Sequence, residues 1–236
     1  DHCCIEDAEF AALNRLWDVV KFLVPTVADQ TKRDQFCIEA AKYAASKGHL
    51  EVVKYLVPID HLRIEAAKYA ASSGHLKVVK FFVLTIADKT KIDKCCIEAA
   101  KSAASNGHLE VVKFLVPTLA GKTQRDQCCI EAAKYAATNG HLEAIKYLVA
   151  TVSHKTQRDQ CCIEAAKYAT ELNQREVMKC LLSCFSTLDL GLQWAVAACS
   201  RLHKDVDASL GLEPDWLFQS STILTFTAAM AIEGRN

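Results

Sequence analysis

Histidines recur in one sequence context, and histidine is both a common metal ligand and a general base near neutral pH. The four histidines that lie between a glycine and a leucine are His49, His75, His108 and His141. Equivalent residues in stacked repeats lie about 8–10 Å apart, whereas zinc holds its nitrogen ligands at about 2 Å. Leu16 and Gln174 also occupy this position in the end copies. We therefore predict a structural role for these histidines and no metal site.

Cysteines offer a second kind of chemistry, and the chain has 12 of them. Four adjacent pairs recur, namely Cys3-Cys4, Cys95-Cys96, Cys128-Cys129 and Cys161-Cys162. Adjacent cysteines lack the C-x-x-C spacing of zinc sites. Phe36 and Leu62 replace the first cysteine of the pair, which predicts an apolar core position, and Arg63 replaces the second, which predicts partial exposure. We expect free thiols in a reducing compartment, with the exposed ladder as a candidate redox sensor.

The most enzyme-like group of residues lies near the C-terminal end. Cys199 and His203 are four residues apart, so they would share a helix face, and Asp205 and Asp207 follow them. A Cys–His dyad oriented by an acid is a nucleophile pattern. However, no glycine turn that could form an oxyanion hole adjoins it, and a core cysteine beside a surface histidine fits the same residues. We expect no catalytic residue, and a cysteine-dependent enzyme or thiol redox sensor stays as an alternative function.

The elements that would position these residues follow from a fixed internal period. Each copy opens on an isoleucine, at spacings of 33, 26, 33, 33 and 33 residues, and these are Ile5, Ile38, Ile64, Ile97, Ile130 and Ile163. In "DQFCIEAAKYAASKG", Asp34 is the predicted N-cap and Gly48 the predicted left-handed residue after the helix. A second helix follows in "HLEVVKYLV", and we expect Pro25, Pro58 and Pro117 to end this helix. Each unit is therefore a predicted helix–turn–helix.

These units resemble ankyrin repeats. The resemblance rests on the 33-residue period, on "AASKGHLEVVKYLV" and "AATNGHLEAIKYLV", and on Ala28-Asp29 and Ala87-Asp88 in the linkers. It covers about residues 1–185, which we assign to six helix pairs. It implies a curved solenoid that binds other proteins through a concave face made by the first helices and the loop tips.

Two features depart from the family pattern or from the repeat. Glu39-Ala40-Ala41-Lys42 stands where the family usually has Thr-Pro-Leu-His, and the usual loop glycine is absent. Both changes favour a first helix that extends backwards in place of a projecting hairpin. Residues 186–236 do not repeat cleanly and are predicted to form a degenerate repeat and a divergent C-terminal helical cap. The predicted fold class is all-α, a helix–turn–helix repeat solenoid.

Charge and hydropathy exclude other classes of partner. Lys plus Arg equals Asp plus Glu at 28 each, so no basic excess attracts nucleic acid or an anionic membrane. The longest uncharged run, Trp216–Ile232, has 17 residues, whereas a spanning helix needs about 20. The chain begins at Asp1 without a visible signal peptide, which leaves open a trimmed chain, or an arm of a larger or host-delivered effector protein. Ile232–Arg235 reads "IEGR", a protease site used in expression fusions, and we assign it no function.

Recurrent charges on the first helices mark the candidate site for a protein partner. Each helix carries a glutamate and a lysine three residues apart, a pair that contributes only about 0.2–0.5 kcal/mol to the helix. The pairs are Glu39/Lys42, Glu65/Lys68, Glu98/Lys101, Glu131/Lys134 and Glu164/Lys167. Nearby residues that vary between units could set selectivity, namely Ser46, Lys47, Ser73, Asn106 and Asn139.

Tyrosines of the first helices are candidate anchors only if they are exposed, because a helical wheel places them on the apolar side. They are Tyr43, Tyr69, Tyr135 and Tyr168. The predicted function is a non-catalytic protein–protein interaction scaffold that needs no cofactor. The predicted location is intracellular, either the cytoplasm or, for a delivered effector, the cytosol of a host cell.

Overall fold

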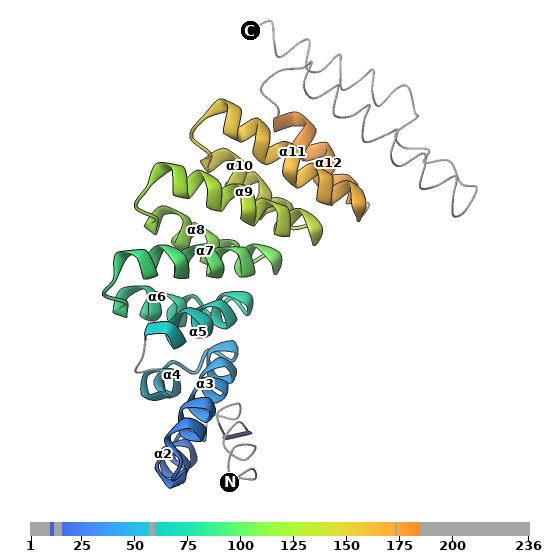
Figure 1. Ribbon diagram of the computed structural model, residues 1–236. Helices are drawn as coiled ribbons and strands as arrows, with labels where there is room; N and C mark the ends of the chain where they lie inside the picture. Colours follow the sequence, from blue (N-terminus) through green and yellow to red (C-terminus); the bar gives the residue numbers. More distant parts are fainter. Residues whose placement is uncertain (1–9, 12–15, 57–59, 173, 185–236) are drawn as a thin grey trace, which may run out of the picture.

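Helix pairs stacked in chain order make up the computed structural model, which describes residues 10–11, 16–56, 60–172 and 174–184 (Figure 1). The first helices of the pairs are α3 (Gln30–Ser46), α5 (Asp60–Ser72), α7 (Lys89–Ser105), α9 (Lys122–Thr138) and α11 (Lys155–Glu171). The second helices are α2 (Trp17–Thr26), α4 (Leu50–Leu56), α6 (Leu76–Thr85), α8 (Leu109–Thr118), α10 (Leu142–Thr151) and α12 (Arg175–Cys184). The all-α repeat solenoid is confirmed. The unit at Ile5 and the predicted C-terminal cap lie outside the described residues.

A glycine turn joins the two helices of each pair. Gly48 has a φ of 73°, a left-handed conformation that only glycine adopts without strain. The amide of Gly48 donates to the carbonyl of Ala45 at 3.1 Å, and the amide of His49 donates to that of Ala44 at 2.8 Å. These two bonds form a Schellman motif, which satisfies carbonyls that the end of α3 would leave unpaired. The turn predicted from Gly48 is confirmed, and it recurs at Gly74, Gly107 and Gly140.

First helices begin earlier than the predicted N-cap. Asp29 caps α3, because its carboxylate accepts from the amides of Thr31 at 2.8 Å and Lys32 at 3.2 Å. Asp34 lies inside α3, where it accepts from the side chain of Gln30 at 2.8 Å, so its assignment as N-cap was wrong. The predicted backward extension of the first helix is confirmed. Only three residues, 27–29, separate α2 from α3, which leaves no room for a projecting hairpin there.

Proline does not determine where the second helices end. Pro117 lies inside α8, which continues to Thr118, and α10 ends at the equivalent Thr151 with Ala150 in place of the proline. The expectation that proline ends these helices was therefore wrong by one residue at Pro25 and Pro117, and Pro58 lies outside the described residues. The next residue is extended and buried in each case, as Leu119 and Val152 show.

An arginine of the following helix holds this extended residue in place. Arg33, Arg125 and Arg158 each donate to the carbonyl of the residue that follows the preceding second helix. For Arg125 the bond to the oxygen of Leu119 is 2.8 Å, and for Arg158 the bond to the oxygen of Val152 is 3.0 Å. The helix therefore ends where burial of an apolar side chain and a side-chain hydrogen bond compete successfully with another helical turn.

The residues that the two kinds of helix bury account for the curvature of the stack. First helices bury alanines such as Ala99, Ala100 and Ala103, which allow close helix packing, whereas second helices bury larger residues such as Val112 and Leu115. Neighbouring first helices accordingly pack extensively against one another, and neighbouring second helices make much sparser contact. The stack therefore curves with the first helices on the inner side (Figure 1).

Candidate functional site

The recurrent histidines connect one repeat to the preceding repeat. Nε2 of His108 donates to the carbonyl of Ser72 at 3.0 Å, and equivalent bonds join His75 to Ser46 and His141 to Ser105. In the last unit Gln174 replaces histidine, and its amide donates to the carbonyl of Thr138 at 3.3 Å. This shared bond supports the predicted structural role, since a metal ligand or base could not be replaced by glutamine without loss of function.

The cysteine pairs are more deeply buried than the sequence predicted. Cys95, Cys128 and Cys161 occupy the core, as expected for the first position. At the second position, however, Cys96, Cys129 and Cys162 are each 0% exposed, and only Cys37 is half-buried. The predicted ladder of exposed thiols is therefore wrong.

Arg63 misled that prediction because its guanidinium has a partner inside the protein. It donates to the carbonyl of Thr85, the last residue of α6, at 2.7 Å. Burial also raises the pKa of Cys95, Cys96 and Cys128 to about 12, so these thiols stay protonated and unreactive at neutral pH.

Two other kinds of site find no support in the described part of the chain. No cluster of three or more His, Cys, Asp or Glu residues there has the geometry to hold a metal ion. No helix there is long and apolar enough to span a membrane. The group of Cys199, His203, Asp205 and Asp207 lies outside the described residues.

Glutamate–lysine pairs form a continuous row on the exposed side of the first helices, which we call the first-helix face. The ion pairs within one helix are Glu39–Lys42 (2.9 Å), Glu98–Lys101 (3.1 Å), Glu131–Lys134 (3.0 Å) and Glu164–Lys167 (2.7 Å). Lys134 also approaches Glu164 of the next repeat at 3.8 Å. Glu65 and Lys68 occupy the same register on α5, with the lysine exposed. The charges are thus paired along the helices and, at Lys134, between them.

The row is electrostatically connected to neighbouring tyrosines. The ammonium of Lys42 lies 5.9 Å from the ring centroid of Tyr69 in the next repeat. Its hydrogen bond with Glu39 raises the pKa of Lys42, with a further contribution from the charge of Glu65. Lys42 therefore remains a fixed positive charge at any physiological pH.

The tyrosines of the first helices are partly exposed. The exposed fractions are 39% for Tyr43, 41% for Tyr69, 47% for Tyr135 and 39% for Tyr168. Their placement on the apolar side was wrong, because each follows its glutamate by four residues and so shares the charged face, with its ring extending toward solvent. On α7 the residue at this register is Ser102.

Several of the predicted selectivity residues already have partners within the protein. Asn139 donates to the carbonyl of Ser105 at 2.7 Å and so joins two repeats. Asn106 donates to a carbonyl of its own helix, and the hydroxyl of Ser46 does the same. Lys47 is exposed and Ser73 is half-buried.

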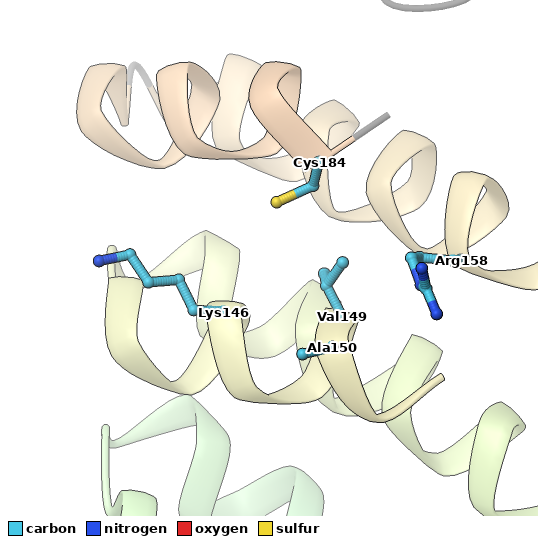
Figure 2. A pocket seen from close by; sticks show the side chains of 5 residues that line it. All are labelled: Lys146, Val149, Ala150, Arg158 and Cys184. Atoms are coloured by element: carbon cyan, nitrogen blue, oxygen red, sulfur yellow. The ribbon is translucent and has the colours of Figure 1, made fainter. Parts of the chain in front are cut away.

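One pocket of about 340 Å³ lies away from this face, between α10, α11 and α12. It is lined by Lys146, Val149, Ala150, Arg158 and Cys184 (Figure 2). Sequence reasoning did not single out Cys184 or its neighbour Cys180. Their spacing of four residues in "MKCLLSC" could have indicated that the two thiols share a helix face.

Comparison with known proteins agrees with this architecture. A search of the curated proteins found no match. The family profile described as ankyrin repeats (3 copies) matches residues 9–95 and 97–193, which is most of the chain. The helix pairs, the glycine turns and this match together show that the chain belongs to the ankyrin repeat family.

Proposed function

We propose that the chain is a non-catalytic scaffold that binds a protein partner across the first-helix face. Ankyrin repeats are in general protein–protein interaction modules. The observation that carries the proposal for this face is the row of partly exposed tyrosines beside the ion pairs, repeated on four of the five described first helices. Tyrosine supplies a large contact area and is enriched at the energetic centres of interfaces.

The structure assigns these charges little importance for stability. Exposed i, i+3 pairs contribute about 0.2–0.5 kcal/mol each, and the ion pairs of the first helices are mostly half-buried at the helix surface. Alternating acid and base instead suits a partner that carries both signs of charge, and such complementarity governs specificity and association rate more than affinity. Glu39, Lys42, Glu65, Lys68, Glu98, Lys101, Glu131, Lys134, Glu164 and Lys167 are the proposed contact residues, with Ser46, Lys47, Ser73, Asn106 and Asn139 at the edge.

The chain offers a matched pair of variants for the test. Glu98→Lys with Lys101→Glu reverses an ion pair on the first helix α7, and Glu110→Lys with Lys113→Glu reverses one on the second helix α8. Both double exchanges retain opposite charges three residues apart and leave the net charge unchanged.

A photo-crosslinking amino acid at Tyr135 would first capture the partner, and Kd for the purified partner would then be measured with both variants. We expect the exchange on α7 to weaken binding about tenfold, a loss of roughly 1.4 kcal/mol, while the exchange on α8 leaves Kd unchanged. Unchanged binding by the α7 variant, or equal losses in both, would show that the first-helix face is not the site.

We also infer an intracellular location. The described cysteines are all free, and thiols persist in reducing compartments. Measurement of the free-thiol content of the natural protein directly after extraction with a thiol-blocking reagent tests this.

A further inference from the structure

Three cysteines meet where the last described helix pair joins the stack. Cys162 on α11 and Cys180 on α12 both donate a thiol hydrogen bond to the sulfur of Cys184. Cys162 is completely buried, and Cys184 is half-buried. The sulfur of Cys184 therefore has two thiol donors on its protein side.

Its other side opens into the pocket between α10, α11 and α12. Figure 2 shows Cys184 projecting from α12 toward α10, with Lys146 and Arg158 on either side of the space. Lys146 forms an ion pair with Glu143 at 2.7 Å but is half-exposed and stays charged. Small molecules can thus reach Cys184 in a setting with two nearby cations, whereas Cys162 is shielded from solvent.

This arrangement favours the thiolate of Cys184 over those of its neighbours. The hydrogen bonds from Cys162, Cys180 and Ser183 hold the pKa of the Cys184 thiol well below its ordinary value, and the charge of Arg158 acts in the same direction. The same hydrogen bonds, together with burial, raise the pKa of Cys162 and Cys180. A thiolate that is accessible and cationically flanked is the form that reacts with peroxides.

We propose that Cys184 is a site of reversible oxidation by hydroperoxides and that it then forms a disulfide with Cys162. In the first step the thiolate of Cys184 attacks the outer oxygen of the hydroperoxide, the O–O bond breaks, and a sulfenic acid and an alkoxide or hydroxide form. In the second step the sulfur of Cys162 attacks the sulfenic sulfur, an S–S bond forms, and the hydroxyl leaves as water with the proton of the Cys162 thiol. Any dithiol reductant reverses the change by thiol–disulfide exchange.

Geometry selects Cys162 as the resolving residue in preference to Cys180. Residues four apart on a helix have Cβ atoms about 5–6 Å apart, whereas a disulfide needs about 3.5–4.5 Å. Cys162 comes from a different helix, so its approach to Cys184 is not limited by helix geometry. The resulting bond would join α12 to α11 and is independent of the first-helix face, so the two proposals stand or fall separately.

The test uses the full chain, treated with hydrogen peroxide and then digested with trypsin under non-reducing conditions. Sequence cleavage sites at Lys167, Arg175 and Lys179 place Cys162 and Cys184 in different peptides, whereas Cys180 and Cys184 share one. We expect a cross-linked pair of peptides, with fragment spectra that assign Cys162 and Cys184. We also expect Cys184 to react at least about ten times faster than Cys128, because its thiolate fraction is much larger.

Variants distinguish the roles of the three thiols. Cys162→Ser should abolish the cross-link and allow a sulfenic acid to be trapped on Cys184 with a dimedone reagent, while Cys180→Ser should retain the cross-link. A Cys180–Cys184 bond in the untreated sequence, or equal reaction rates for Cys184 and Cys128, would overturn the proposal. Circular dichroism of each variant checks that it folds, and Cys162→Ala serves as a second variant because it introduces no buried hydroxyl.

Discussion

Replacing His108 by alanine should weaken the coupling between two central repeats. Nε2 of His108 donates to the carbonyl of Ser72 at 3.0 Å, and the ring lies against Gly74 so closely that a Cβ there would be 2.6 Å from Nδ1. Removing the ring leaves a carbonyl at the end of α5 without its partner, at a cost of about 1–3 kcal/mol for a partly buried acceptor. We therefore expect the free energy of unfolding to fall by about 2 kcal/mol.

His108→Gln is the informative comparison, because Gln174 already makes the equivalent bond in the last unit. We expect this variant to lose less than about 1 kcal/mol, since a hydrogen-bond donor is retained. Lys113→Ala on the exposed side of α8 serves as the control and should cost no more than about 0.5 kcal/mol.

Urea unfolding followed by far-UV circular dichroism measures all three variants. Repeat proteins unfold according to the coupling between neighbouring repeats, so His108→Ala should also broaden the transition. The reasoning is refuted if His108→Gln costs as much as His108→Ala, because the hydrogen bond would then contribute nothing, or if His108→Ala matches the Lys113→Ala control.

Three further outcomes follow from single side chains. Gly107→Ala should cost about 2 kcal/mol or more in urea unfolding, because φ is 74° and the new Cβ would lie 2.6 Å from Nδ1 of His141; a loss below about 0.5 kcal/mol would contradict this. Asp126→Ala should cost about 1–3 kcal/mol, since the buried carboxylate accepts from the amide of Ser153 at 3.0 Å, and Asp126→Asn should recover part of the loss; equal losses would exclude the hydrogen bond as the cause. Burial raises the pKa of Cys128 from 9.0 to about 12, so the unfolded chain loses this proton at lower pH than the folded chain and the free energy of unfolding should fall as pH rises from 9 to 12. A pH series of urea midpoints should show a shallower fall for Cys128→Ala, and an identical slope would argue against this contribution.

The sequence by itself determined the repeat, its class and its turns. A fixed period with glycine after each first helix depends on local backbone geometry, because only glycine adopts a φ of 73–76° freely, and this geometry is written in the sequence. The histidine position was likewise readable as structural, since Gln174 replaces histidine in the last unit.

Helix ends were less readable, for a physical reason. Asp29 and Asp34 are both good N-cap residues, and the choice between them depends on whether the intervening turn can pack in the stack. The ends of the second helices depend on Arg125 and Arg158, which reach back to Leu119 and Val152 across the loop.

Only the tertiary structure decided which side chains are reachable. Arg63 suggested an exposed position, yet its guanidinium binds the carbonyl of Thr85, and the equivalent Cys96 is fully buried. Tyr135 lies on the charged face with 47% of its surface exposed, although a helical wheel placed it among the apolar residues. Cys184 gains its neighbour Cys162 only when α12 packs on α11. Exposure and contacts between repeats depend on which faces neighbouring helices cover, and that information is not local to any one segment.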